Sequence, residues 1–444
     1  QAKTLFPYTT LFRSWMLDAL NEGSPMHASS SLARPAGLYV LCAVEVAAGF
    51  ALYVLGSLLL LHLIATQGLD EATALRWVGG YNAATFLAPL VGGALADAGL
   101  RLQRAVRLGA ILLAFGFVAL ALRRDARLGL SILVLGNGLF RSNVVALLGR
   151  LYPVGDPRLD AAYRVFYAAF NFGGLVAPPI AGLLAQTGQG HAAFLLAAAA
   201  MGLAVLILRL AEPYLVLTDA CPHDFRTGTT ERPIGDVRSR WLAIGVVAQV
   251  TLLWALSYGQ TDGVLLLWVR DYTVRGVLGH EISPSAFVAV PPLFVLIWAA
   301  LAALLGKRCQ PSTRNGKLAA GLLSTSLGFA LLIFATTLSG QRHSAAWPLA
   351  CLSLLTLGEL LVVPVTQSLM GQLAPRRHTG LSYALWYAAA ALGLYLAGQL
   401  GAQWYTLSPA SFFALVATAP LCAVALIACG RGSFCEMQWS DTAD

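Results

Sequence analysis

The chain has 444 residues, of which 58% are hydrophobic and 11% are charged, and its mean hydropathy is +0.70. Soluble domains carry about 25% charged residues, so this composition excludes an ordinary soluble protein. The formal net charge is +8, but the basic residues fall in short segments between apolar runs, a distribution typical of topology determinants that argues against nucleic-acid binding.

Residues 1–35 precede the first apolar run and divide into two parts. Residues 1–14 contain the string TLFPYTTLFRS, which resembles the translation of a sequencing adapter, so we interpret them as a non-native segment. The polar stretch 15–35 lacks the compact apolar core of a signal peptide. We interpret it as an N-terminal cytoplasmic tail and expect the first membrane span to act as the targeting signal.

Apolar runs that approach the ~20 residues needed to cross a bilayer then recur along the whole chain. They lack the two-residue alternation of a membrane barrel, so we expect helices, which satisfy their own backbone groups in lipid. Glycines, prolines and charge clusters divide the runs into twelve predicted spans. These are 36–65, 77–98, 104–122, 128–151, 161–185, 191–211, 240–268, 283–306, 315–338, 346–373, 379–402 and 409–430.

The spans group into two sets of six. We predict an N-terminal bundle at 36–211, a polar cytoplasmic linker at 212–239, a C-terminal bundle at 240–430 and a cytoplasmic tail at 431–444. Lysine and arginine are more frequent in the loops that this arrangement places inside the cell if both termini are cytoplasmic. We therefore predict a multi-pass protein of a bacterial inner membrane with both ends inside.

A sequence repeat relates the two halves. The fifth span contains Tyr-x-x-Phe-Tyr-Ala-Ala from Tyr163, and the eleventh contains Tyr-x-x-Trp-Tyr-Ala-Ala from Tyr383, with a glycine following in register in both. Upstream, Leu-Gly-x-Leu-x-Pro ending at Pro153 matches Met-Gly-x-Leu-x-Pro ending at Pro375. Two parallel halves of six spans are the pattern of major facilitator transporters. We predict an all-α polytopic membrane protein with the major facilitator fold, its twelve transmembrane helices forming two six-helix bundles.

Three charged residues lie near the middle of predicted spans: Glu45 in the first, Arg141 in the fourth and Glu359 in the tenth. A charge at the bilayer centre costs roughly 2.5–3.5 kcal/mol on insertion scales, so such residues are usually functional. We interpret them as a solute or proton site and predict that Glu45 and Arg141 form an ion pair. The alternatives are a structural ion pair between helices and, for Glu359, a packing acid bonded to a neighbouring span. Asp262 lies nearer a span end, where it can reach water.

Prolines also fall inside three spans, as Pro178-Pro179 in the fifth, Pro291-Pro292 in the eighth and Pro364 in the tenth. Interrupted helices are tolerated in membranes where the backbone is buried in protein or lines a cavity. We interpret these prolines as breaks that allow gating bends, and we expect the tenth span to bend so that its acid faces the first half.

The stretch from Gly136 to Pro153 reads GNGLFRSNVVALLGRLYP and is similar to GTGGFKPNVSALLGKLYP, a signature of the proton-coupled oligopeptide transporter family. The resemblance extends over nearly everything from Leu38 to Gly398, and we identify the chain as a divergent member of this family. It includes the motifs at 87–97, 155–160, 166–178, 358–375 and 385–386.

The departures from the family pattern concern its charged residues. The first-span motif E-x-x-E-R-F-x-Y-Y-G-M-R is matched at Glu45 and Tyr53 but loses its other charges. Since an arginine keeps its proton at physiological pH, a Glu45–Arg141 pair titrates less readily than the family's glutamate–lysine arrangement. The departures are Ala48 and Gly49 for the second acid and its arginine, Gly56 for the later arginine, Phe86 for a second-span tyrosine, Arg141 for the lysine, Gly259 for the seventh-span acid and Pro291 for an asparagine.

The resemblance implies secondary active uptake of di- or tripeptides, or of peptide-like zwitterions, by alternating access. Arg141 is expected to hold the substrate carboxylate and Glu359 the substrate amine, while Glu45 and Glu359 are the candidates for proton coupling. Whether coupling survives the missing acids is left open. The remaining predicted substrate-binding residues are Tyr53, Phe86, Asn171 and Trp386.

Other functions stay open from the sequence alone. One is a major facilitator transporter of another small metabolite or drug, with altered or absent proton coupling, and another is a non-transporting relative that acts as a sensor or scaffold. An enzyme is disfavoured, because no nucleophile–base pair or phosphate-binding loop is recognisable. Cysteines without a CxxC motif and histidines without ligand spacing predict no metal site and no cofactor. We expect a monomer whose partners are a small-molecule substrate, protons if coupling survives, and the lipid bilayer.

Overall fold

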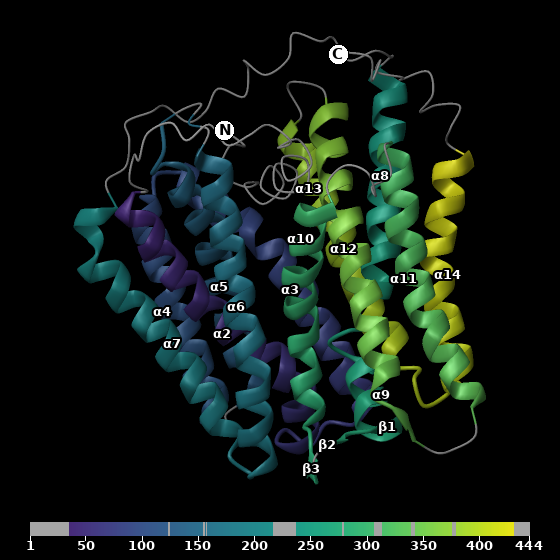
Figure 1. Cartoon of the computed structure of the whole chain (residues 1–444). Helices are drawn as coiled ribbons and strands as arrows, with labels where there is room; N and C mark the ends of the chain where they lie inside the picture. Colours follow the sequence, from purple (N-terminus) through teal and green to yellow (C-terminus); the bar gives the residue numbers. More distant parts are fainter. Residues whose placement is uncertain are drawn as a thin grey trace.

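A computed structural model of the chain describes residues 35–122, 125–153, 156, 158–215, 237–277, 279–305, 313–338, 342–374 and 379–429. The predicted non-native segment 1–14, the predicted tail 431–444 and most of the linker lie outside these residues. The described residues form mostly long α-helices that run side by side (Figure 1).

The first half contains six long helices that fall close to the first six predicted spans. The first of them coincides with its predicted range. The helices are α2 (Ala36–Ala65), α3 (Glu71–Asp97), α4 (Leu102–Ala121), α5 (Ala126–Gly149), α6 (Arg158–Gln186) and α7 (Gly190–Leu210), and a short 3-10 helix η1 (Glu212–Tyr214) follows them.

The second half has the same overall plan with more interruptions. Its elements are α8 (Val237–Tyr258), α9 (Val264–Tyr272), the 3-10 helix η3 (Pro284–Ala289), α10 (Val290–Leu305), α11 (Arg314–Thr337), α12 (Ala346–Leu373), α13 (Thr379–Gly401) and α14 (Pro409–Cys429). Strand β1 (Thr273–Val274) pairs in parallel with β4 (His343–Ser344), and β2 (Gly276–Val277) pairs antiparallel with β3 (His280–Glu281). We call the end of the molecule that carries the β2–β3 hairpin the hairpin end (Figure 1).

Eleven segments in the described part of the chain are long and apolar enough to cross a membrane. The twelfth long helix in the described residues, α3, has 27 residues and is not among these eleven. It begins where the Asp70 side chain accepts a hydrogen bond from the Thr73 backbone N–H at 2.9 Å, and this bonding lowers the pKa of Asp70. The predicted polytopic helical fold is confirmed.

Two details of the predicted spans are wrong. The seventh span is not one helix, because the chain turns at Gly259–Gly263 between α8 and α9. Two of the three predicted proline breaks are also absent: α6 is continuous through Pro178 and Pro179, and α12 is continuous through Pro364. In the eighth span the proline pair lies where the 3-10 helix η3 gives way to α10, so that span is interrupted where predicted.

The sequence repeat reappears in the packing of both halves. A Cβ added to Gly149 would lie 2.8 Å from the Tyr163 hydroxyl, and one added to Gly371 would meet the hydroxyl of the matching Tyr383. The paired glycines of α6 and α13 likewise approach the backbones of α2 and α8, the first long helices of their halves. The repeated residues are therefore the ones that let corresponding helices approach closely, as expected for two copies of one bundle.

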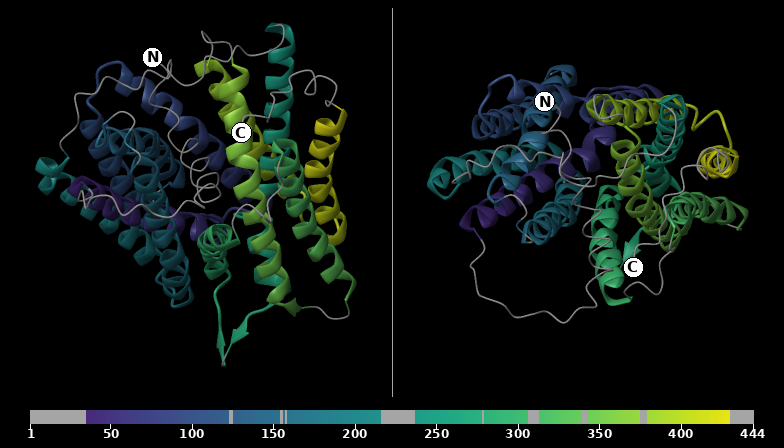
Figure 2. Two further views of the ribbon diagram at one scale, coloured as in Figure 1. Left: turned by 45° about the horizontal axis from the view of Figure 1, so that its top comes forward. Right: turned by 90° about the horizontal axis from the view of Figure 1, so that it is seen from above.

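The two halves stand side by side, with the purple-to-blue helices of the first half on one side and the green-to-yellow helices of the second on the other (Figure 2). α3 packs along α13. A Cβ added to Gly79 would lie 2.6 Å from the Cα of Gly398, so two glycines allow the close approach of these helices.

Candidate functional site

The predicted ion pair of the first half is present. Nη1 of Arg141, on α5, lies 3.0 Å from Oε2 of Glu45, on α2. The Glu45 side chain is buried, whereas 19% of the Arg141 side chain is exposed, so the cation reaches solvent and the acid does not. The other carboxylate oxygen, Oε1 of Glu45, is buried without a hydrogen-bond partner among the described residues. An unsatisfied buried oxygen is costly, and a proton or water at this position would relieve that cost.

Phe170 of α6, which sequence reasoning missed, lies against the same cation. The Cζ atom of Arg141 is 3.9 Å from the centroid of the Phe170 ring. This is well within the roughly 6 Å over which an aromatic face attracts a cation. Tyr53 of α2 packs against Phe170 in turn, with 5.8 Å between ring centroids and 59° between ring planes. The cation therefore lies on an aromatic wall built from α2 and α6.

In the second half, Glu359 of α12 accepts a hydrogen bond from the Tyr258 hydroxyl, with 2.6 Å between the oxygens. Tyr258 is the last residue of α8, so the predicted alternative of a bond to a neighbouring span is realised. Glu359 is nevertheless only half-buried, and no ion pair involves it in the part of the chain that the structure describes. Glu359 thus combines a hydrogen bond to a neighbouring helix with partial exposure.

Two tyrosines lie near the opposed charges of both halves. Tyr53 on α2 and Tyr167 on α6 each lie close enough to both Arg141 and Glu359 to interact electrostatically with them. Tyr387 on α13 lies within range of Arg141 as well. The predicted cation of the first half and the predicted anion of the second therefore border the same region between the halves.

Asp262 belongs to the same region. It lies in the turn between α8 and α9, is half-buried, and interacts electrostatically with Glu359. Its Oδ2 accepts a hydrogen bond from Nδ2 of Asn82 on α3, at 3.5 Å, which links the two halves. Asp262 also borders a small cavity lined mainly by Leu265, Val269, Phe287 and Leu352.

The other predicted substrate-binding residues differ in how deeply they are buried. Asn171 is buried, and its amide donates to the Tyr167 backbone oxygen at 2.9 Å. Trp386 is also buried, and its Nε1 donates to the Thr366 hydroxyl at 3.1 Å. Phe86 is half-buried and approaches Tyr387 across the halves, with 6.3 Å between ring centroids. Phe86 thus borders the region between the halves, while Asn171 and Trp386 support the residues that line it.

The glycines at positions where the family carries charges differ in the space around them. A Cβ added to Gly49 would collide with the backbone of Phe170, and one added to Gly259 would lie 2.7 Å from the Cβ of Ala397. Around Gly56, no described atom outside its own stretch of helix lies within 4 Å of such a Cβ. Two of the three missing side chains have therefore been replaced by close helix packing, and the third by open space.

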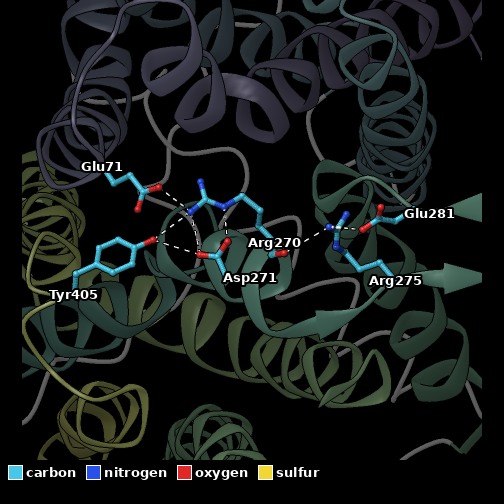
Figure 3. Close-up of polar contacts among 6 residues, drawn as sticks. All are labelled: Glu71, Arg270, Asp271, Arg275, Glu281 and Tyr405. Atoms are coloured by element: carbon cyan, nitrogen blue, oxygen red, sulfur yellow. Dashed lines mark hydrogen bonds and ion pairs between the residues drawn. The ribbon is translucent and has the colours of Figure 1, made fainter. Parts of the chain in front are cut away.

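A network at the hairpin end joins the halves (Figure 3). Nη2 of Arg270, on α9, lies 2.7 Å from Oε1 of Glu71, the first residue of α3. Nε of Arg270 lies 2.7 Å from Oδ1 of Asp271, and its Nη2 donates to the Tyr405 hydroxyl at 3.2 Å. Tyr405 in turn donates to Oδ2 of Asp271 at 3.3 Å. One guanidinium from the second half thus holds the start of α3 from the first.

The hairpin itself adds a second link. Nη2 of Arg275 lies 2.7 Å from Oε1 of Glu281 (Figure 3). Nη1 of Arg275 donates to the Ile282 backbone oxygen, and both contacts stabilise the β2–β3 hairpin. Gln186, at the end of α6, donates to the Glu281 backbone oxygen at 2.9 Å. At the opposite end of the molecule, the ion pair of Arg107 with Glu212 stays within one half. The described halves are therefore held together at the hairpin end.

Comparisons with known proteins agree with this architecture. The Major Facilitator Superfamily model matches residues 41–398. The peptide transporter YePEPT of Yersinia enterocolitica is 30% identical over 432 residues, which cover 79% of this chain and 84% of the relative. The di-/tripeptide transporter of Lactococcus lactis is 26% identical over 464 residues, which cover 86% of this chain and 92% of that protein.

Solved structures give the same result. One is the crystal structure of a peptide transporter POT in complex with alafosfalin, whose sequence is 25% identical to this chain. The match covers 93% of this chain and 97% of that transporter, with a TM-score of 0.82. The predicted fold and the predicted family relationship are both confirmed. By its sequence from residue 41 to 398, its two related six-helix halves and its similarity to these relatives, the chain belongs to the proton-coupled oligopeptide transporter family of the major facilitator superfamily.

Proposed function

We propose that this membrane protein takes up di- or tripeptides, or peptide-like zwitterions, by alternating access. Similar proteins carry the names peptide transporter and di-/tripeptide transporter, and related structures hold alafosfalin and 5-aminolevulinic acid. The family consists of transporters rather than enzymes. We further propose that the chain works as a monomer in a bacterial inner membrane.

The observation that carries this proposal is the opposition of charge between the halves. Arg141 projects from the first half, Glu359 belongs to the second, and both are partly exposed to the region that Tyr53 and Tyr167 border. A zwitterion presents a carboxylate and an ammonium group on one small molecule, so it can engage both charges together. Away from bulk water, each of these pairings is stronger than it would be in water.

The contacts between the halves support a conformation that is open toward the cytoplasm. We place the hairpin end outside the cell and both termini inside, which keeps the basic loops cytoplasmic. The Arg270 network and the Gln186 bond then close the outer side. Alternating access requires these outer contacts to break when the inner side closes around the substrate.

Glu45 and Glu359 are the proposed proton-coupling residues. Glu45 has an unpaired buried oxygen beside its ion pair with Arg141. A proton on that carboxyl group would weaken its hold on Arg141 and so favour the binding of a substrate carboxylate. Glu359 accepts from Tyr258, and an arriving ammonium group would compete for the same carboxylate.

Uptake by purified protein in proteoliposomes tests the proposal. Labelled dialanine should accumulate in protein-containing vesicles, and an inwardly directed proton gradient should increase its initial rate. Organic anions without an amine should not compete. If organic anions compete as well as dipeptides do, or if dialanine is not transported at all, the cargo belongs to another class of small metabolite or drug.

A further inference from the structure

The contact between Phe170 and Arg141 goes beyond the residues that the function above requires. We propose that Phe170 is a positioning residue that fixes the plane of the Arg141 guanidinium for the substrate carboxylate. This inference rests on the proposed function, since it concerns the same cation. It adds a residue that carries no charge and contributes no hydrogen bond to the site.

The guanidinium is held in two different ways. Glu45 accepts from one of its nitrogens, at 3.0 Å, whereas the centroid of the Phe170 ring lies 3.9 Å from its central carbon. A hydrogen bond acts on one nitrogen of the group, whereas an aromatic ring close to the central carbon restricts the movement of the whole planar group. The ring contact therefore adds to the orientation that hydrogen bonding gives. A group that is ordered before the substrate arrives loses less entropy on binding.

Phe170 reaches this position because α2 and α6 approach very closely. At Gly49 the α2 backbone lies directly against the carbonyl group of Phe170, and at Gly173 the α6 backbone lies against Val46 and Phe50. Position 49 is where the family pattern has an arginine. A large side chain there would separate the two helices and withdraw Phe170 from Arg141. The glycine at 49 and the aromatic contact are therefore parts of one arrangement.

The same contact explains why an arginine suits position 141. A guanidinium is planar, delocalised and weakly hydrated, so it stacks on aromatic rings and still donates in its own plane. A lysine ammonium is a compact, strongly hydrated charge that gains less from such a ring. Stacking also compensates Arg141 for part of the water that it loses at this depth. We infer that Phe170 contributes to binding through an arginine and much less through a lysine.

The test measures inhibition of labelled dialanine uptake by unlabelled dialanine and by its C-terminal amide, which lacks the carboxylate. Phe170→Leu should weaken inhibition by dialanine about tenfold, as expected for loss of a desolvated cation–π contact. Inhibition by the amide should change less than about twofold, so the preference for the free acid falls. The maximal rate at saturating substrate should stay close to that of the unaltered protein. Phe170→Tyr, which keeps the ring, should retain the preference.

Two further variants separate positioning from packing. Phe172→Leu is the matched control, since Phe172 is a phenylalanine on the same helix whose side chain is 55% exposed, and it should leave the preference unchanged. In an Arg141→Lys background, Phe170→Leu should cost less than about threefold. An equal cost with arginine and with lysine at position 141, or an equal loss of inhibition by the acid and the amide, would overturn the positioning role. If the unaltered protein fails to prefer the acid over the amide, the proposed carboxylate site itself is wrong, which is a different result.

Discussion

At the scale of single residues, the site depends on how two charges are held. Arg141 is bound by Glu45 and covered by Phe170, whereas Glu359 has one described hydrogen bond, from Tyr258. The sequence predicted the charged members because a charge inside an apolar span stands out. It did not predict Phe170 or Tyr258, because aromatic residues are common in membrane helices and only packing shows which ones reach a charge.

Glu359→Gln tests the role of the acid at this scale. Glutamine keeps the size and the hydrogen-bonding capacity of the side chain but cannot ionise, so it removes the negative charge while leaving the bond to Tyr258 possible. We expect the preference for amine-bearing substrates over their N-acetylated analogues to fall at least about tenfold, consistent with loss of one charge-assisted hydrogen bond. The pH dependence of uptake should also flatten. Unchanged amine preference together with an unchanged pH profile would show that Glu359 is only a packing residue.

Arg141→Ala tests the cation. Alanine removes the proposed carboxylate anchor and leaves the buried Glu45 without its ion-pair partner. We expect uptake to fall to background while the protein still inserts and elutes as a monodisperse species. Near-normal transport by this variant would contradict the assigned role, and loss of insertion would instead indicate a structural ion pair.

At the scale of the helices, most boundaries were predictable and a few were not. Spans such as 36–65 and 346–373 coincide with α2 and α12, because long apolar runs end at clear polar or helix-breaking signals. The turn after Tyr258 was missed because Gly259–Gly263 is flanked by apolar sequence that continues the hydropathy signal. The breaks predicted at the prolines of α6 and α12 were wrong, because neighbouring helices allow a proline to remain within a continuous membrane helix.

A matched pair of glycine substitutions tests the account of helix packing. Gly49→Ala places a Cβ against the α6 backbone, whereas Gly56→Ala places one in open space on the same helix. We expect Gly49→Ala to destabilise the protein by about 1–3 kcal/mol, the usual cost of overpacking. Gly56→Ala should be neutral or stabilising by up to about 1 kcal/mol, since alanine favours helix over glycine. Melting temperatures in detergent would measure both, and equal melting temperatures would contradict the proposed close α2–α6 approach.

At the scale of the whole molecule, the two-fold repeat was predictable and the conformation was not. Matching motifs predicted two similar halves, and matching glycine contacts confirm that they pack alike. Which end is closed depends on contacts between side chains such as Glu71 and Arg270. These residues lie far apart in the sequence, and no shared sequence motif relates them. Only the fold brings them together.

The contribution of this network to closure can be measured by cysteine labelling. In a background without native cysteines, Thr261→Cys places a thiol beside the small cavity near the hairpin end. Adding Glu71→Gln removes an ion pair between the halves, a loss of roughly 0.2–1 kcal/mol for a partly exposed pair. We expect labelling by a membrane-impermeant maleimide to accelerate by about two- to fivefold. Glu212→Gln, which removes ion pairs within the first half at the opposite end, should leave the rate unchanged, and equal rates in all three proteins would exclude a closing role for Glu71.

The central claim is that Arg141 and Glu359 bind opposite ends of one zwitterion. The most direct test is a competition experiment with dialanine, its C-terminal amide and its N-acetyl derivative, carried out on the unaltered protein, Arg141→Lys and Glu359→Gln. We expect a crossed pattern. Arg141→Lys, whose compact ammonium cannot pair with a carboxylate through two parallel hydrogen bonds, should reduce discrimination against the amide alone, and Glu359→Gln should reduce discrimination against the N-acetyl derivative alone. If both variants lose discrimination against both analogues equally, or if neither loses any, the two charges do not bind opposite ends of the substrate.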